Sequence, residues 1–119
     1  AFPSTAVSFE FWIMTNDRDR DQAAGIMDYH AGCCGADNDF SVQDYETLDL
    51  AVNGDWRDHD EMSLDDGDWH HVVVTWDSST GISRSYKNGT LFSTVEDLGL
   101  EESINSSGSL MLAQDQDSH

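Results

Sequence analysis

Basic side chains are scarce in this chain. Five Lys and Arg stand against 24 Asp and Glu, which gives a formal net charge of −19. A surface of this charge repels the phosphate backbone of nucleic acids and the anionic head groups of membranes, so neither is expected as a partner. The sequence also lacks an apolar run of the roughly 18 residues that a membrane-spanning helix needs, and membrane insertion is therefore not expected.

Proline and cysteine are scarce as well. One proline and nine glycines do not fit a fibrous or disordered chain, and twelve aromatic residues provide enough apolar surface for one core, so residues 1–119 are predicted to form a single domain. The two cysteines, Cys33 and Cys34, are neighbours, and a disulfide between neighbours needs a distorted peptide bond. Whether they pair with other cysteines or stay free remains open. No initiator Met or signal-like segment is present, and we expect the domain to be a piece of a larger, processed chain.

What the sequence has in place of helical periodicity is alternation of apolar and polar residues, which is typical of half-buried strands. In the run 70–76, Val72, Val74 and Trp76 share one face, and His71, Val73 and Thr75 share the other. Further strands are expected at residues 6–14, 24–30, 40–45, 47–53, 82–87, 90–95 and 109–113. Trp12, Trp69 and Trp76 are predicted to lie in the core.

Turn signals separate these runs. Asn53-Gly54 and Asn88-Gly89 are the residue pairs preferred in two-residue hairpin turns, and the polar link 77–81 ends in glycine. Short strands joined by such turns predict an all-β, antiparallel sandwich. Trp56 stands in a polar stretch and is a candidate for stacking against a sugar ring, with capping of the sandwich edge as the alternative.

Three motifs together resemble the pentraxin and laminin-G-like domains. They are GDWHHVVVTWDSSTG at residues 67–81, YKNG at 86–89 and GSLMLAQDQDS at 108–118. The resemblance covers nearly the whole chain and implies a concanavalin-like jelly roll of which this chain is a truncated part. Pentraxins proper carry a disulfide whose positions align with Glu10 and Val73 here, so that bridge is absent and the broader laminin-G-like group fits better.

The resemblance also implies a calcium site. In the family an Asp-Asn pair on one loop meets a Glu-Gln-Asp segment on another, and this chain offers Asp37 and Asn38 with Asp115, Gln116 and Asp117. Carboxylate and carbonyl oxygens are the ligands that calcium prefers, and three converging negative charges call for a cation. Two ordinary acidic turns are the alternative interpretation of the same residues.

The sequence therefore predicts an extracellular, calcium-dependent recognition module rather than an enzyme. Its ligand would be a carbohydrate, a phosphate-bearing molecule or a protein. An alternative is a structural building block of a fibre, sheath or multidomain adhesin, which assembles with itself or with neighbouring domains through exposed edge strands.

Two further observations concern modification and catalysis. The sequons at Asn88 and Asn105 permit glycosylation if the chain is secreted. Glycoside hydrolysis, which the concanavalin-like fold also supports, is disfavoured because the Glu-x-Asp-x-x-Glu run of the retaining enzymes is missing. No nucleophile elbow is present either.

Overall fold

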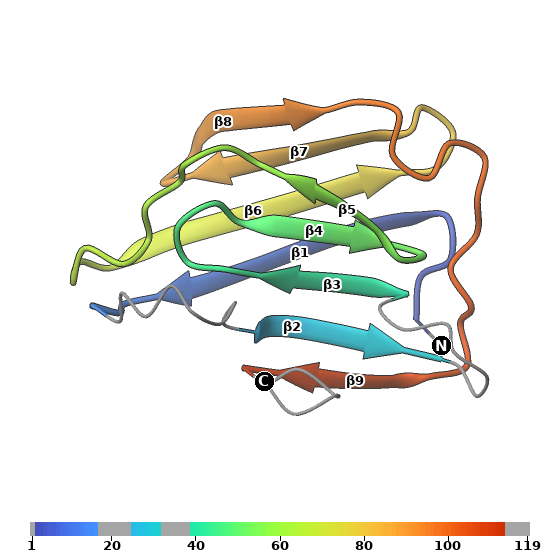
Figure 1. The fold of residues 1–119 in the computed structure, drawn as a ribbon, viewed down its shortest axis with the longest axis horizontal. Helices are drawn as coiled ribbons and strands as arrows, with labels where there is room; N and C mark the ends of the chain where they lie inside the picture. Colours follow the sequence, from blue (N-terminus) through green and yellow to red (C-terminus); the bar gives the residue numbers. More distant parts are fainter. Residues whose placement is uncertain (1, 17–24, 32–38, 114–119) are drawn as a thin grey trace.

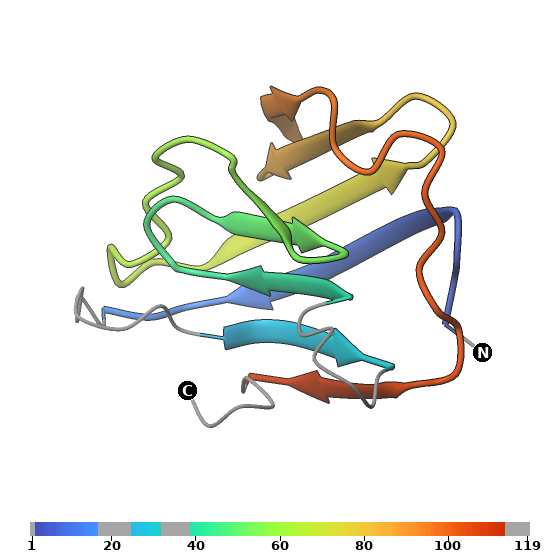
Figure 2. The same cartoon turned by 45° about the vertical axis from the view of Figure 1, so that its right-hand side comes forward.

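Two antiparallel sheets, stacked face to face, make up the computed structural model (Figures 1 and 2). The structure describes residues 2–16, 25–31 and 39–113. Within these ranges all regular elements are strands, so the predicted all-β, antiparallel sandwich is confirmed. No helix in the described part of the chain is long and apolar enough to cross a membrane.

The four-stranded sheet contains the strongest pattern of the sequence. Its strands, in spatial order, are β1 (Ala6–Ile13), β6 (His70–Asp77), β7 (Ile82–Lys87) and β8 (Thr90–Val95). In β6 the side chains at 72, 74 and 76 are buried and those at 71, 73 and 75 are half-buried. The predicted alternation of this strand is therefore confirmed, and it determines which face is turned to the core.

The five-stranded sheet lies against it. Its strands, in spatial order, are β5 (Asp55–Asp58), β4 (Asp49–Val52), β3 (Phe40–Gln43), β2 (Gly25–His30) and β9 (Ser109–Leu112). The polar stretch of β5 is not predicted as a strand from its sequence. It pairs with β4 because the tight turn at Asn53-Gly54 folds the chain straight back, with Val52 opposite Asp55.

Both predicted two-residue turns have the backbone that their residues suggest. Asn53 and Gly54 have φ of 49° and 80°, and Asn88 and Gly89 have φ of 53° and 84°. Positive φ at both central positions defines a type I′ turn, whose twist matches that of the strands it joins. These turns fix the register of the β4–β5 and β7–β8 hairpins.

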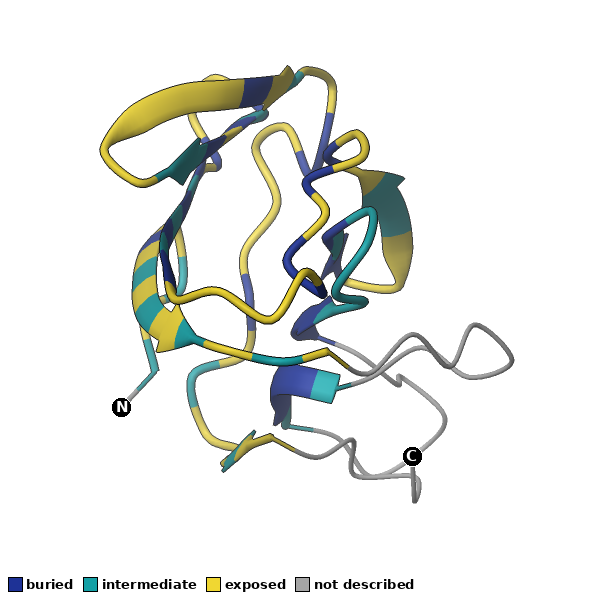
Figure 3. Cartoon of the chain, turned by 90° about the vertical axis from the view of Figure 1, so that its left-hand side faces the viewer, coloured by how far each residue is buried: buried dark blue, intermediate teal, exposed yellow. Residues whose placement is uncertain are grey.

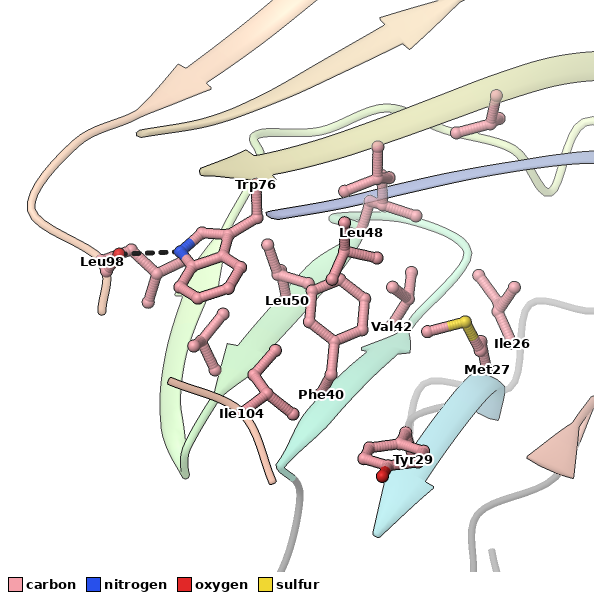
Figure 4. Close-up of a cluster of buried hydrophobic side chains, with 14 of the residues drawn as sticks. Ile26, Met27, Tyr29, Phe40, Val42, Leu48, Leu50, Trp76, Leu98 and Ile104 are labelled. Carbon is pink, nitrogen blue, oxygen red and sulfur yellow. Dashed lines mark hydrogen bonds between the residues drawn. The ribbon is translucent and has the colours of Figure 1, made fainter. Parts of the chain in front are cut away.

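The core fills the space between the sheets, where the buried segments gather when the molecule is seen end-on (Figure 3). Trp76 is its largest buried side chain, and its indole Nε1 donates to the carbonyl oxygen of Leu98 at 2.9 Å. Figure 4 shows this ring with its neighbours from both sheets; the labelled residues include Phe40, Val42, Leu48, Leu50 and Ile104.

Two of the three tryptophans assigned to the core from sequence are not there. The side chains of Trp12 and Trp69 are 67% and 61% exposed. For Trp12 the prediction was wrong because strand alternation decides the face, and Trp69 lies in the loop before β6 (His70–Asp77) and not in a strand. In β1 the inward positions are 7, 9, 11 and 13, so position 12 points outward, where the Trp12 ring lies 5.0 Å from that of His71.

The positions that the pentraxin resemblance aligns with a disulfide face each other across two strands. Glu10 of β1 lies directly opposite Val73 of β6. A bridge between them would be geometrically reasonable for a pair of directly opposed residues, and here a carboxylate and an isopropyl group stand in its place. The register therefore agrees with the family alignment although the cysteines are absent.

Candidate ligand-binding face

One row of side chains crosses the five-stranded sheet on the face opposite the core. Asp28 of β2 pairs with Ser41 of β3, Ser41 pairs with Ala51 of β4, and Ala51 pairs with Trp56 of β5. The flanking residues Met27, Val42 and Leu50 belong to the core, so this row points away from it. We call the outward side of the sheet, defined by these four residues, the ligand face.

Most of the row on the ligand face is buried rather than open to solvent. Asp28 and Ser41 are each only 2% exposed, and Ala51 is fully buried. The Ser41 hydroxyl is 3.4 Å from the carbonyl oxygen of Met27, which it faces as a donor. Trp56 is half-buried at the end of the row, on the edge strand of the sheet. A buried carboxylate and an accessible indole thus lie at the two ends of one row.

Further acidic groups share this face. Asp49 lies opposite Gln43 on one side and Asp58 on the other, on the same outward positions as Ala51. Burial raises the pKa of the Asp49 carboxyl, the hydroxyl of Thr47 opposes this rise, and the charges of Asp44 and Asp58 add to it. The local potential is therefore negative, which favours a cation or a cationic ligand.

The segment that contains Asp37 and Asn38 leaves and rejoins the sheet between β2 and β3. Asp39 accepts the N–H of Ala31 through Oδ2 at 2.8 Å, and the same oxygen is 3.4 Å from Nδ1 of His30. The N–H of Asn53 donates to the carbonyl oxygen of Asp39 at 2.9 Å. These contacts hold the two ends of the segment together, and the predicted ligands Asp37 and Asn38 themselves lie outside the described residues.

The second predicted calcium segment follows β9. The N–H of Ala113 donates to the carbonyl oxygen of Ile26 at 2.8 Å, so the chain is still attached to β2 at this point. Asp115, Gln116 and Asp117 lie outside the described residues, as do Cys33 and Cys34. Within the described ranges, no group of three or more His, Cys, Asp or Glu could hold a metal ion.

A buried histidine–serine pair has no access to a substrate. Nε2 of His59 is 2.8 Å from Oγ of Ser83, and both side chains are fully buried between the sheets. Burial lowers the pKa of His59 to about 4, against the charges of Asp60 and Asp58, which raise it. This pair ties the end of β5 to β7. Sequence reasoning missed it, because the contact joins two residues that are distant in the chain.

The two sequons differ in what their side chains do. Asn88 accepts the N–H of His71 through Oδ1 at 2.9 Å, and its Nδ2 is 3.1 Å from Nδ1 of His70. Asn105 is exposed, and its Oδ1 accepts the N–H of Ser107 at 3.1 Å. Both asparagines lie at the surface, so glycosylation of either remains a prediction.

Comparison with known proteins assigns the chain to a family. The family model described as the concanavalin A-like lectin/glucanases superfamily matches residues 1–119. The chain belongs to this superfamily. Within it, the rat protein named sushi, von Willebrand factor type A, EGF and pentraxin domain-containing protein 1 is 32% identical over 117 residues, which cover 94% of this chain and 3% of that protein.

Pentraxins are further relatives of this superfamily member. Human neuronal pentraxin-1 is 39% identical over 54 residues, which cover 45% of this chain and 12% of that protein. The native heptameric SAP-like pentraxin from Limulus polyphemus has the same fold, with a TM-score of 0.77 and 24% identity. The match covers 98% of this chain and 55% of that chain.

A second solved structure extends the likeness. The full extracellular region of zebrafish Gpr126/Adgrg6 matches with a TM-score of 0.78 and 18% identity, over 99% of this chain and 16% of that one. The chain thus spans between 3% and 55% of the length of these relatives. The resemblance to pentraxin and laminin-G-like domains, inferred from three motifs, is confirmed.

Proposed function

We propose that this chain is a calcium-dependent recognition module of an extracellular protein, and that it binds a carbohydrate, a phosphate-bearing molecule or a protein on its ligand face. The observation that carries the proposal is the accessible end of the row, where the half-buried Trp56 lies on an edge strand next to the paired carboxylates of Asp49 and Asp58. Membership of a superfamily of lectins and glucanases supports it.

Asp39 and Ala113 are the described residues next to the two predicted calcium segments, and we call them the anchors. Their separation is short enough for the predicted calcium ligands to meet. Asp39 is level with His30 of β2, and Ala113 is level with Ile26, so the anchors differ by four residue steps along the strands and by two strand spacings across them. At about 3.3 Å per residue and about 4.8 Å per strand, this separation is roughly 16 Å. Two residues of chain on each side reach about 7 Å each, and the carboxylate side chains span the rest.

The net charge of −19 suggests that calcium stabilises the fold in addition to its proposed role in recognition. Carboxylates that converge without a cation repel one another, so a bound divalent ion stabilises the folded chain. With a dissociation constant of about 1 mM, typical of extracellular calcium modules, 10 mM calcium would add about 1.4 kcal/mol to the free energy of unfolding.

The first prediction is a calcium-dependent melting temperature. We expect 10 mM calcium to raise Tm by about 5 °C relative to chelator, measured by differential scanning fluorimetry. Asp37→Asn and Asp117→Asn should each remove most of this rise, whereas Asp68→Asn, which changes an exposed carboxylate elsewhere, should keep it. Equal concentrations of magnesium control for ionic strength. A Tm that is the same in calcium, magnesium and chelator would exclude the calcium part of the proposal.

The second prediction concerns Trp56. A glycan array probed with the labelled chain in calcium should identify ligands whose affinity falls about fivefold in Trp56→Ala, because the loss of one stacked ring is worth about 1 kcal/mol. Trp69→Ala is the matched control, since this exposed indole lies in the loop before β6, a strand of the other sheet. If both substitutions weaken binding equally, or neither does, the ligand does not lie on the ligand face.

A further inference from the structure

The two sequons present their amide groups differently, and the amide of Asn88 is fully engaged. Asn88 opens the type I′ turn between β7 and β8. Its N–H donates to the carbonyl oxygen of His71 at 2.8 Å, and its Oδ1 accepts the N–H of the same residue at 2.9 Å. Its Nδ2 lies 3.1 Å from Nδ1 of His70. Both the oxygen and the nitrogen of this amide therefore have partners on β6.

The partner of the Asn88 nitrogen is a buried imidazole whose tautomer is fixed. Nε2 of His70 is 2.8 Å from Oδ1 of Asp66, and because a carboxylate can only accept, Nε2 carries the ring proton. Nδ1 of the neutral ring is then an acceptor, and Nδ2 of Asn88 donates to it. His70 is only 7% exposed. A sugar on Nδ2 of Asn88 would be attached to the atom that faces this ring, so it would crowd the ring or displace the hydrogen bond.

The amide of Asn105 is held only through its oxygen. This residue is exposed, its Oδ1 accepts the N–H of Ser107 at 3.1 Å, and no group in the described ranges accepts a hydrogen bond from its Nδ2. Its backbone is nevertheless fixed to the sandwich, since the Tyr29 hydroxyl donates to its carbonyl oxygen at 2.6 Å and the preceding Ile104 is 1% exposed. The segment runs along one end of the sandwich between β8 and β9 (Figure 1). A substituent on Asn105 would project from a fixed position into solvent.

We propose that Asn105 carries an N-linked oligosaccharide in the secreted protein and that Asn88 does not. The proposal rests on the extracellular location in the proposed function, because the reaction takes place in the secretory pathway. In this reaction Nδ2 forms a bond to the anomeric carbon of an oligosaccharide carried on a polyprenyl diphosphate. The bond from this carbon to the diphosphate oxygen breaks, the diphosphate leaves with the electron pair, and one amide proton passes to a base of the transferase.

Attachment takes place on the growing chain, so the fold decides which modified asparagine it can accommodate. At Asn105 the fold forms without the loss of a hydrogen bond. At Asn88 it forms only with the contact to the buried His70 disturbed, and such chains are less stable and are removed during secretion. A glycan on Asn105 would also cover the end of the sandwich at the Asn53-Gly54 turn, where Nδ2 of Asn53 donates to the carbonyl oxygen of Ser103 at 3.2 Å. A partner would then have to bind elsewhere.

Glycan occupancy in the secreted protein tests the proposal. The chain is secreted from cultured mammalian cells behind a heterologous signal peptide, unsubstituted and as Thr90→Ala and Ser107→Ala, which each remove one sequon at an exposed position. Digestion with peptide-N-glycosidase F and mass spectrometry of the peptides measure the occupancy. We expect one glycan on the unsubstituted chain and on Thr90→Ala, and none on Ser107→Ala. Occupancy at Asn105 should exceed that at Asn88 by at least about tenfold.

Three results of this experiment would each overturn the proposal: comparable occupancy at the two asparagines, a glycan on Asn88 alone, or no glycan on the secreted protein. The signal peptide directs the chain into the secretory pathway, and the measurement needs neither calcium nor a ligand. A failure of the recognition proposal therefore leaves this test intact.

A second measurement on unglycosylated protein from bacteria tests the engagement of the two amides. Asn88→Asp and Asn105→Asp are a matched pair, since each keeps Oδ1, loses the N–H donors of Nδ2 and adds one negative charge. At pH 8, Asn88→Asp should lower Tm by about 4 °C because His70 loses its donor, and Asn105→Asp should change it by less than about 1 °C. Differential scanning fluorimetry measures both shifts. Equal shifts would show that the fold does not distinguish the two amides, which would also overturn the proposal.

Discussion

Replacing Trp76 by alanine is expected to lower the free energy of unfolding by about 3–5 kcal/mol, the largest effect of any single substitution named here. The indole is 1% exposed and packs between the two sheets, so its removal leaves a cavity that rigid neighbours cannot fill. The carbonyl oxygen of Leu98 also loses its donor at 2.9 Å. A domain of this size is stable by roughly 5–15 kcal/mol, so the variant would be marginal.

Urea denaturation followed by circular dichroism measures this loss of stability, and two further variants serve as comparisons. Trp76→Phe keeps most of the packing and loses the hydrogen bond, so an intermediate loss is expected. Trp69→Ala removes the same kind of side chain from the exposed surface and should change the free energy of unfolding by less than about 0.5 kcal/mol. Equal losses at positions 69 and 76 would show that the assignment of core and surface is incorrect.

Acidification is expected to destabilise the fold between pH 6.5 and pH 4 through His59. Burial lowers the pKa of this imidazole from 6.5 to about 4, so in this window the unfolded chain binds a proton that the folded chain does not. The contribution of His59 to the free energy of unfolding is fully present above pH 6.5. It is lost as the pH falls toward 4, by about 3 kcal/mol in total.

Other groups act outside this window or with the opposite sign. Hydrogen bonds from the N–H of Asp68 and from His70 lower the pKa of Asp66, and those from Ser79 lower the pKa of Asp77. Both carboxylates therefore stabilise the fold above the ordinary aspartate pKa, and this stabilisation is lost only at lower pH. Asp49 has a raised pKa and is protonated more readily in the folded state, which opposes the loss. Loss of negative charge also reduces repulsion in a chain of −19.

A comparison of the pH profiles of two proteins separates the effect of His59 from the effects of the aspartates and the net charge. His59→Gln removes the titrating group and keeps a polar side chain, so its free energy of unfolding should fall less steeply from pH 6.5 to pH 4 than that of the unsubstituted chain. Denaturation with urea at several pH values provides the profile. Parallel profiles for the two proteins would mean that His59 does not titrate as its burial requires.

Sequence alone predicted the fold where local rules decide. Alternation in β6, the Asn-Gly turns and the polar link at 77–81 each specify structure within a few residues, and all three are confirmed. Prediction from the sequence failed where contacts with distant parts of the chain determine the structure. β5 is a strand because β4 lies beside it, and Trp12 is exposed because it lies on the outer face of the four-stranded sheet.

The candidate site shows the same division. Asp37, Asn38 and the segment 115–117 were identified from family motifs, and they remain a prediction. Asp28 and Ser41 carry no motif, and only the register of β2, β3 and β4 aligns them with Trp56. The His59–Ser83 contact likewise depends on how the sheets stack. Such cross-strand rows have no signal in a single sequence.

The central claim is that two acidic segments, residues 37–38 and 115–117, hold one calcium ion between them. A crystal structure of the protein grown in calcium, with anomalous scattering to locate the ion, tests it directly. We predict one site in which oxygens of Asp37 and Asn38 and of residues 115–117 lie about 2.3–2.6 Å from the same ion. Saturating calcium with no ion between these segments, or with the segments held far apart, would contradict it.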